Sequence, residues 1–128
     1  MSTIHLSALV FTTLTAVVIL FQLCLAAGAP WGKASMGGKY PGKYPPKMRV
    51  VAVVNVFILA GMAVVVLSRA GVILPSLMPF SKIAIWVVAL FFLVGTIMNT
   101  ITPSKIERIW APVALGQLIA SIAVALSN

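Results

Sequence analysis

The segment VVAVVNVFILAGMAVVVLS, residues 50–68, contains no charged side chain and is long enough to cross a membrane as one helix. Backbone N–H and C=O groups find no hydrogen-bond partner in lipid, so a spanning segment must be a helix or belong to a closed barrel. Three other apolar segments accompany it, at about residues 4–29, 81–99 and 105–126. We therefore predict an all-α polytopic membrane protein, a four-transmembrane-helix bundle that forms a single domain over residues 1–128.

The composition of the chain supports this prediction. Of its 128 residues, 62% are hydrophobic and 8% are charged, whereas soluble domains carry about 25% charged residues. A soluble fold of this length could not bury so much apolar surface, because much of its chain must face water. The first apolar segment resembles a secretory signal, but it is too long and no Lys or Arg precedes it, so we expect it to be retained as the first helix.

The charged residues are nearly all basic, with nine Lys or Arg against one acid, Glu107, and a formal net charge of +8. They lie between the apolar segments, which favours anionic lipid headgroups and not nucleic acid as partners. Only Arg69 and Lys82 fall on the side of the second connection. Because the other basic residues cluster in the first and third connections, the positive-inside rule places those connections in the cytoplasm and both termini outside it.

A basic loop rich in Gly, Pro and Tyr, residues 30–49, joins the first two spans and contains a tandem Gly-Lys-Tyr-Pro repeat at 38–45. Lysines that alternate with tyrosines suit the surface of an anionic membrane. One interpretation is a loop that contacts lipid headgroups or docks a partner; the other is an ordinary positive-inside loop with aromatic anchors. The candidate contact residues are Trp31, Lys33, Lys39, Tyr40, Lys43, Tyr44, Lys47 and Arg49.

Polar side chains within the spans form a second pattern. In the first span Thr12, Thr15 and Gln22 recur at steps of three and seven, and in the fourth Gln117 and Ser121 are four apart. Such spacing keeps each set on one helical face. The candidate polar cluster, placed mostly in the cytoplasmic half of the bundle, comprises Gln22, Asn55, Asn99, Glu107 and Gln117.

This polar cluster has two interpretations. Asn and Gln side chains hydrogen-bond between packed membrane helices, and small residues such as Gly116 and Ala120 let those helices approach. Alternatively, the same side chains line a polar cavity that opens to the cytoplasm and binds a small solute. The positions of the residues do not decide between packing and a cavity.

Glu107, the only acid, lies at the start of the fourth span. The run Ser104-Lys105-Ile106-Glu107 matches a capping box, in which the Ser and Glu side chains satisfy free backbone N–H groups, so it predicts a helix that starts there. A further hypothesis pairs Glu107 with Arg49 or Arg108, which ties the third connection to the first.

The chain contains few side chains that could act in catalysis: no Asp, one Glu, one His and one Cys. A carboxylate pair, a Ser-His-acid set or a metal site cannot be assembled from these residues within one chain. We therefore expect no enzyme activity, no catalytic or metal-binding residues and no cofactor.

Two stretches of the sequence resemble a family of short four-span bacterial integral membrane proteins without an assigned function. The first combines GAPWG at 28–32, MGG at 36–38 and PPKMR at 45–49; the second is NTITPSKIERIWAPV at 99–113. The resemblance implies a location in the bacterial cytoplasmic (inner) membrane and carries no activity with it.

From the absence of catalytic groups and the abundance of packing signals, we expect a structural or accessory subunit. It would pack with itself as a homo-oligomer or with partner membrane proteins in a complex. The alternative is a small oligomeric transporter or channel with a polar cavity open to the cytoplasm.

Overall fold

The computed structural model describes residues 2–127, and within this range the long elements are four helices. They are α1 (Thr3–Ala27), α2 (Pro46–Arg69), α3 (Met78–Ile101) and α4 (Trp110–Ala125). Short 3-10 turns lie in the connections: η1 (Gly32–Ala34), η2 (Met36–Gly38), η3 (Pro75–Leu77) and η4 (Glu107–Ile109). Each long helix, with its adjoining turn where present, is long and apolar enough to cross a membrane. The prediction of an all-α, four-span membrane protein is confirmed.

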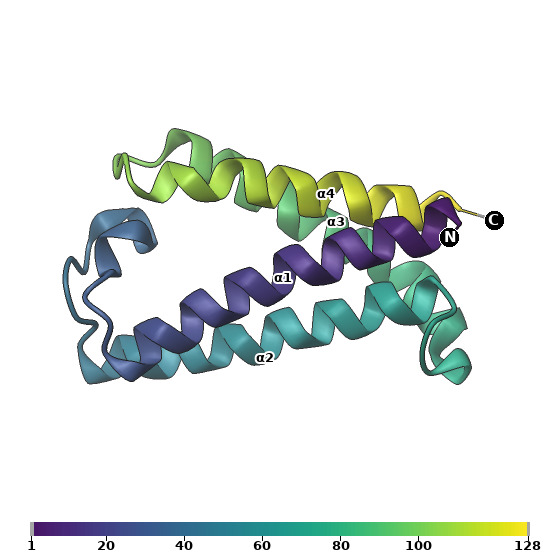
Figure 1. Ribbon diagram of the computed structural model, residues 1–128, viewed down its shortest axis with the longest axis horizontal. Helices are drawn as coiled ribbons and strands as arrows, with labels where there is room; N and C mark the ends of the chain where they lie inside the picture. The colour runs from purple at the N-terminus through teal and green to yellow at the C-terminus, as the bar shows by residue number, and fades with distance from the viewer. Residues whose placement is uncertain (1, 128) are drawn as a thin grey trace.

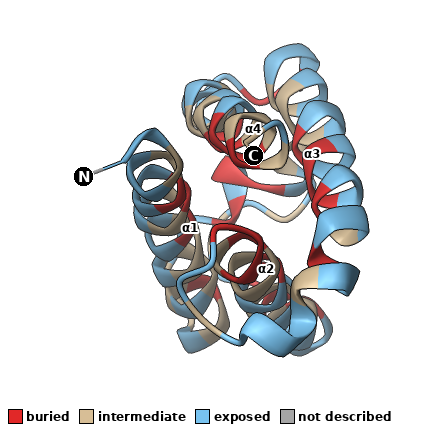
Figure 2. Ribbon diagram, turned by 90° about the vertical axis from the view of Figure 1, so that its right-hand side faces the viewer, coloured by how far each residue is buried: buried red, intermediate tan, exposed pale blue. Residues whose placement is uncertain are grey.

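The four helices run back and forth along the long axis of the molecule (Figure 1). The first and third connections meet at one end, which we call the loop end. The second connection and both chain termini lie at the other, the terminal end (Figure 1). Viewed along the bundle, buried residues face inward and exposed residues face outward on all four helices (Figure 2). This distribution suits a bundle whose outer surface contacts lipid.

The limits of the helices follow from local sequence. Helix α1 ends at Ala27 because Gly28 adopts a left-handed conformation, φ +103°, and its N–H bonds back to the last turn. Helix α2 begins at Pro46, a few residues before the predicted start, because proline is well suited to the first turn of a helix. Helix α3 ends at Ile101, directly before the extended residue Thr102, which precedes a proline.

The predicted capping box is wrong, whereas the fourth span predicted at about residues 105–126 agrees closely with the apolar helical stretch Glu107–Ala125. The 3-10 turn η4 begins at Glu107 and α4 at Trp110, and no side chain caps either element. Ser104 instead donates its Oγ hydrogen to the carbonyl of Lys33, at 2.5 Å. Glu107 accepts a hydrogen bond from the backbone N–H of Gly37, so both polar side chains of the box contact the first connection and do not cap the helix.

The contact between α1 and α4 uses small residues, as the spacing in α4 predicts. Ala114, Ala120 and Ser121 on α4 are all buried. At Gly116, an added Cβ would lie 2.8 Å from Cδ1 of Leu14 on α1, so the absence of a side chain permits this close approach.

Candidate functional site

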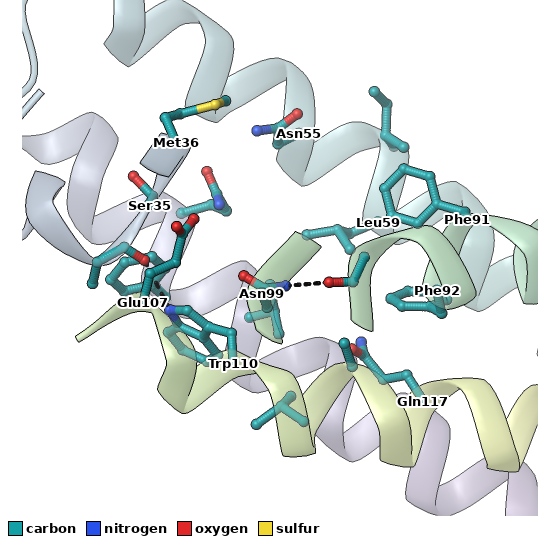
Figure 3. Close-up of a pocket in the computed structure, with 18 of the residues that line it drawn as sticks. Ser35, Met36, Asn55, Leu59, Phe91, Phe92, Asn99, Glu107, Trp110 and Gln117 are labelled. Carbon is teal, nitrogen blue, oxygen red and sulfur yellow. Dashed lines mark hydrogen bonds between the residues drawn. The ribbon is translucent and has the colours of Figure 1, made fainter. Parts of the chain in front are cut away.

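A cavity of about 340 Å³ lies in the loop-end half of the bundle. All four long helices contribute to its walls, and Ala34, Ser35 and Met36 of the first connection cover its loop-end side (Figure 3). The predicted polar cluster converges on this cavity. Each long helix supplies one amide side chain and η4 supplies the carboxylate: Gln22, Asn55, Asn99, Gln117 and Glu107.

The four amide side chains are not equally engaged. Gln117 donates from Nε2 to Thr15 Oγ1 at 3.0 Å, and both residues are buried. Asn99 donates from Nδ2 to the carbonyl of Gly95 on its own helix, at 2.8 Å (Figure 3). Within residues 2–127, no hydrogen bond engages the side chain of Gln22 or Asn55, although both line the cavity. Gln117 therefore fits the packing interpretation, whereas Gln22 and Asn55 fit the cavity interpretation.

Glu107 joins the third connection to the first, but not through an arginine. Its Oε1 accepts hydrogen bonds from the backbone N–H of Gly37, at 3.1 Å, and from the hydroxyl of Thr102. Arg49 donates to the carbonyl of Tyr44 at 2.9 Å, and Arg108 donates to the carbonyl of Thr102 at 3.1 Å. The expected tie between the connections is present, and among the described residues the expected ion pair is replaced by a backbone amide.

The first connection is fastened over the cavity by two further hydrogen bonds. Trp110 donates from Nε1 to the carbonyl of Ala34 at 3.2 Å, and its ring packs on Phe21 with centroids 4.7 Å apart. Ser104 reaches Lys33, as described above. These contacts join the first connection to the third and to α4. They hold the loop over the loop-end side of the cavity.

The basic loop does not present lysines and tyrosines on one exposed face, as the alternation suggested. Lys33, Lys39, Lys43, Lys47 and Trp31 are exposed. Tyr44 is buried against Leu25, Met48 and Ala52, with Tyr40 packed beside it, and its hydroxyl bonds to that of Ser35. The expectation of a headgroup contact through Tyr44 is wrong, because the loop folds back and the apolar ring is buried in this small core.

The chemistry of Tyr44 follows from its burial. Burial raises the pKa of its phenol above the ordinary 10.0, and the charge of Glu107 and the nearby Tyr40 act in the same direction. The hydrogen bond with Ser35 opposes this shift. Tyr44 is therefore a neutral hydrogen-bonding group near pH 7.

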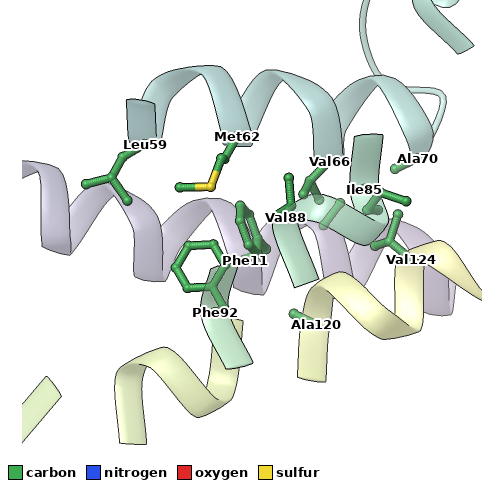
Figure 4. Close-up of a cluster of buried hydrophobic side chains, with 11 residues drawn as sticks. Phe11, Leu59, Met62, Val66, Ala70, Ile85, Val88, Phe92, Ala120 and Val124 are labelled. Carbon is green, nitrogen blue, oxygen red and sulfur yellow. The ribbon is translucent and has the colours of Figure 1, made fainter. Parts of the chain in front are cut away.

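The cavity is closed towards the terminal end by an apolar core. Phe11 and Phe92 meet edge to face, with centroids 5.4 Å apart, and Met62 and Val66 pack beside them (Figure 4). With the Gln117–Thr15 hydrogen bond, this cluster separates the cavity from the terminal end. As far as residues 2–127 are described, the lining of the cavity does not extend past this core, so the cavity is blind at this end.

A second hollow, of about 560 Å³, lies at the terminal end and is lined by Arg69, Lys82 and several apolar residues. Arg69 is buried and donates to the carbonyl of Ser127. None of the polar-cluster or loop residues singled out from the sequence lines this hollow.

Comparisons of the chain with protein-family models, with curated proteins and with solved structures find no match.

Proposed function

We propose that this membrane protein binds a small amphipathic solute in the loop-end cavity. The observation that carries the proposal is that Gln22 and Asn55 line the cavity, and within residues 2–127 their side-chain amides make no hydrogen bond. Both residues are half-buried, and their amide atoms are not fully enclosed by protein. An amide that faces an apolar space without a hydrogen-bond partner costs about 1–3 kcal/mol. Water or a polar group of a bound solute removes this cost, which supports a wet, ligand-accepting space.

The walls of the cavity support a solute that also has an apolar part. Beyond the polar cluster, the lining is made of aliphatic and aromatic side chains such as Val18, Leu59 and Phe92. Ile58 on α2 and Phe91 on α3 also line it, and they are 45% and 48% exposed. These apolar side chains suit the apolar part of such a solute.

Because the cavity is closed towards the terminal end, it favours a protein that binds a solute from one side of the membrane over a channel that conducts it. A channel would need a continuous path, and the Phe11–Phe92 core occupies that path. The protein would act as a transporter only by opening this core in a second state. A structural or accessory subunit remains the second candidate, supported by the tight α1–α4 contact at Gly116.

We also propose that the loop end faces the cytoplasm of a bacterial inner membrane. The exposed lysines at residues 33, 39, 43 and 47 lie at this end, together with Lys105 and Arg108. The positive-inside rule then orients the cavity towards the cytoplasmic side.

Thiol labelling tests both the wet cavity and its side. Asn55 is replaced by Cys in a Cys24→Ser background, and vesicles of each orientation are treated with a charged, membrane-impermeant methanethiosulfonate. We expect Asn55→Cys to react when the reagent is on the loop-end side. The matched control, Phe57→Cys, lies two residues away on the outside of the same helix, 74% exposed, and is expected not to react.

The outcomes separate the proposals. Equal, negligible labelling at positions 55 and 57 would contradict a wet cavity and favour the structural subunit. Labelling of Asn55→Cys only from the periplasmic side would keep the cavity and overturn the proposed orientation.

A further inference from the structure

The charge of the cavity lining is opposite to that of the whole chain. Nine Lys or Arg residues and one acid give the protein a net charge of +8. Among the residues that line the cavity, the acid Glu107 is present and no Lys or Arg is. The cavity therefore has a negative lining within a basic protein.

Glu107 retains capacity to bind a ligand. The hydrogen bonds that reach it from residues 2–127 all use Oε1. Figure 3 shows its carboxylate directed towards the space below Ser35 and Met36. A carboxylate in a partly apolar cavity is stabilised by an opposite charge, and no side chain of the lining supplies one.

Aromatic rings complete the lining. Phe21 and Trp110 form one tilted pair, and Trp110 follows Glu107 by a single turn. Phe91 and Phe92 form a second pair, with centroids 5.2 Å apart, and Tyr44 closes the loop-end side. The face of an aromatic ring attracts a cation, most strongly where water is excluded.

We propose that the ligand of this cavity is a lipophilic cation, an ammonium-type group attached to an apolar body. Glu107 and the ring of Trp110 contact the charged group, while Leu59, Phe91 and Phe92 surround the apolar body. This inference rests on the proposed solute-binding function and adds the charge of the ligand to it. Small anions are disfavoured, because the lining offers them no positive side chain.

Two probes of equal shape test the charge preference. Benzyltrimethylammonium and neopentylbenzene differ only in the replacement of the quaternary nitrogen by carbon. Binding of each to the intact protein in lipid nanodiscs is measured by isothermal titration calorimetry, and the heat from empty nanodiscs is subtracted. We expect the cation to bind about tenfold more tightly than its isostere, from its combined ionic and aromatic contacts.

The wild-type result separates the two proposals without any substitution. Equal affinity for the two probes would overturn the cation preference and leave the cavity as a site for neutral amphipathic molecules. Binding of neither probe above the empty nanodiscs would overturn both the cation preference and solute binding in the cavity.

Substitutions then identify the residues that are responsible for the preference for the cation over its neutral isostere. Glu107→Gln keeps an oxygen that accepts from Gly37 and removes the charge, so the preference for the cation over the isostere should fall to the part that the ring of Trp110 contributes. Phe91→Leu should weaken the binding of both probes by a similar factor, because its ring surrounds the apolar body that they share. The matched control, Phe57→Leu on the outer surface of α2, should bind both probes as wild type does. Unchanged preference in Glu107→Gln would remove Glu107 from the site.

Discussion

The carboxylate of Glu107 accepts a hydrogen bond from the backbone N–H of Gly37 at 3.1 Å, across 70 residues of sequence. This bond joins the cover of the cavity to the third connection. The only acid of the chain therefore has a structural contact and also lines the candidate site.

Glu107→Ala should loosen the cover of the cavity. Loss of a charge-assisted hydrogen bond costs about 1.5 kcal/mol, so trypsin should cut the loop after its exposed lysines about tenfold faster. Ile106→Ala, an exposed neighbour, should be cut at the wild-type rate. Equal cleavage of the Glu107→Ala and wild-type proteins would show that this bond does not hold the loop.

Gly32→Ala should destabilise the fold of the first connection by about 1–3 kcal/mol. An added Cβ would lie 1.8 Å from the carbonyl oxygen of Tyr40 and 2.8 Å from that of Gly42. Gly61→Ala is the control, since a Cβ there meets nothing within 4 Å. Thermal unfolding in detergent measures both variants, and a wild-type midpoint for Gly32→Ala would contradict the described loop.

The Gln117–Thr15 hydrogen bond should contribute modestly to stability. Polar contacts between membrane helices average about 0.6 kcal/mol in double-mutant cycles. A cycle of Gln117→Leu, Thr15→Val and the double variant, measured by reversible unfolding in mixed micelles, should give a coupling of this size. A coupling of zero would mean that the two residues do not interact.

Tyr44 should make stability fall at alkaline pH. Its folded pKa is raised above 10.0, so the folded state keeps the phenolic proton where the unfolded state releases it. The contribution is fully present below pH 10 and is lost as pH rises through the folded pKa. In Tyr40→Phe, where Tyr44 is the remaining tyrosine, tyrosinate absorbance should show a midpoint above 10. A midpoint below the ordinary value would contradict the burial of Tyr44.

The four spans are predictable from sequence because hydropathy and length are local properties. The polar cluster is predictable too, since helical spacing puts Gln22 and Gln117 on inward faces once the spans are known. Helical spacing does not predict which amide side chains form hydrogen bonds. Gln117 donates to Thr15, whereas the amide of Asn55 lines the cavity. That difference depends on how closely helices approach, which a single sequence does not display.

The fold of the first connection is not predictable in the same way. The alternation of lysine and tyrosine suggests one surface strip, yet Tyr44 is buried. No short sequence motif predicts the close approach of Gly32 to Tyr40 and Gly42, because this approach depends on the path of the whole loop. The capping box failed for the same reason, since Ser104 and Glu107 bond to Lys33 and Gly37 of that loop.

The central claim is that water or solute reaches the amides of Gln22 and Asn55 inside the bundle. Solid-state NMR of the unmodified protein in lipid bilayers tests it most directly, by following magnetisation transfer from mobile water to side-chain amides. We predict that the Gln22 and Asn55 signals build up as fast as those of the exposed loop, while Gln117 lags behind. Build-up at Gln22 and Asn55 as slow as at Gln117 would contradict a wet cavity.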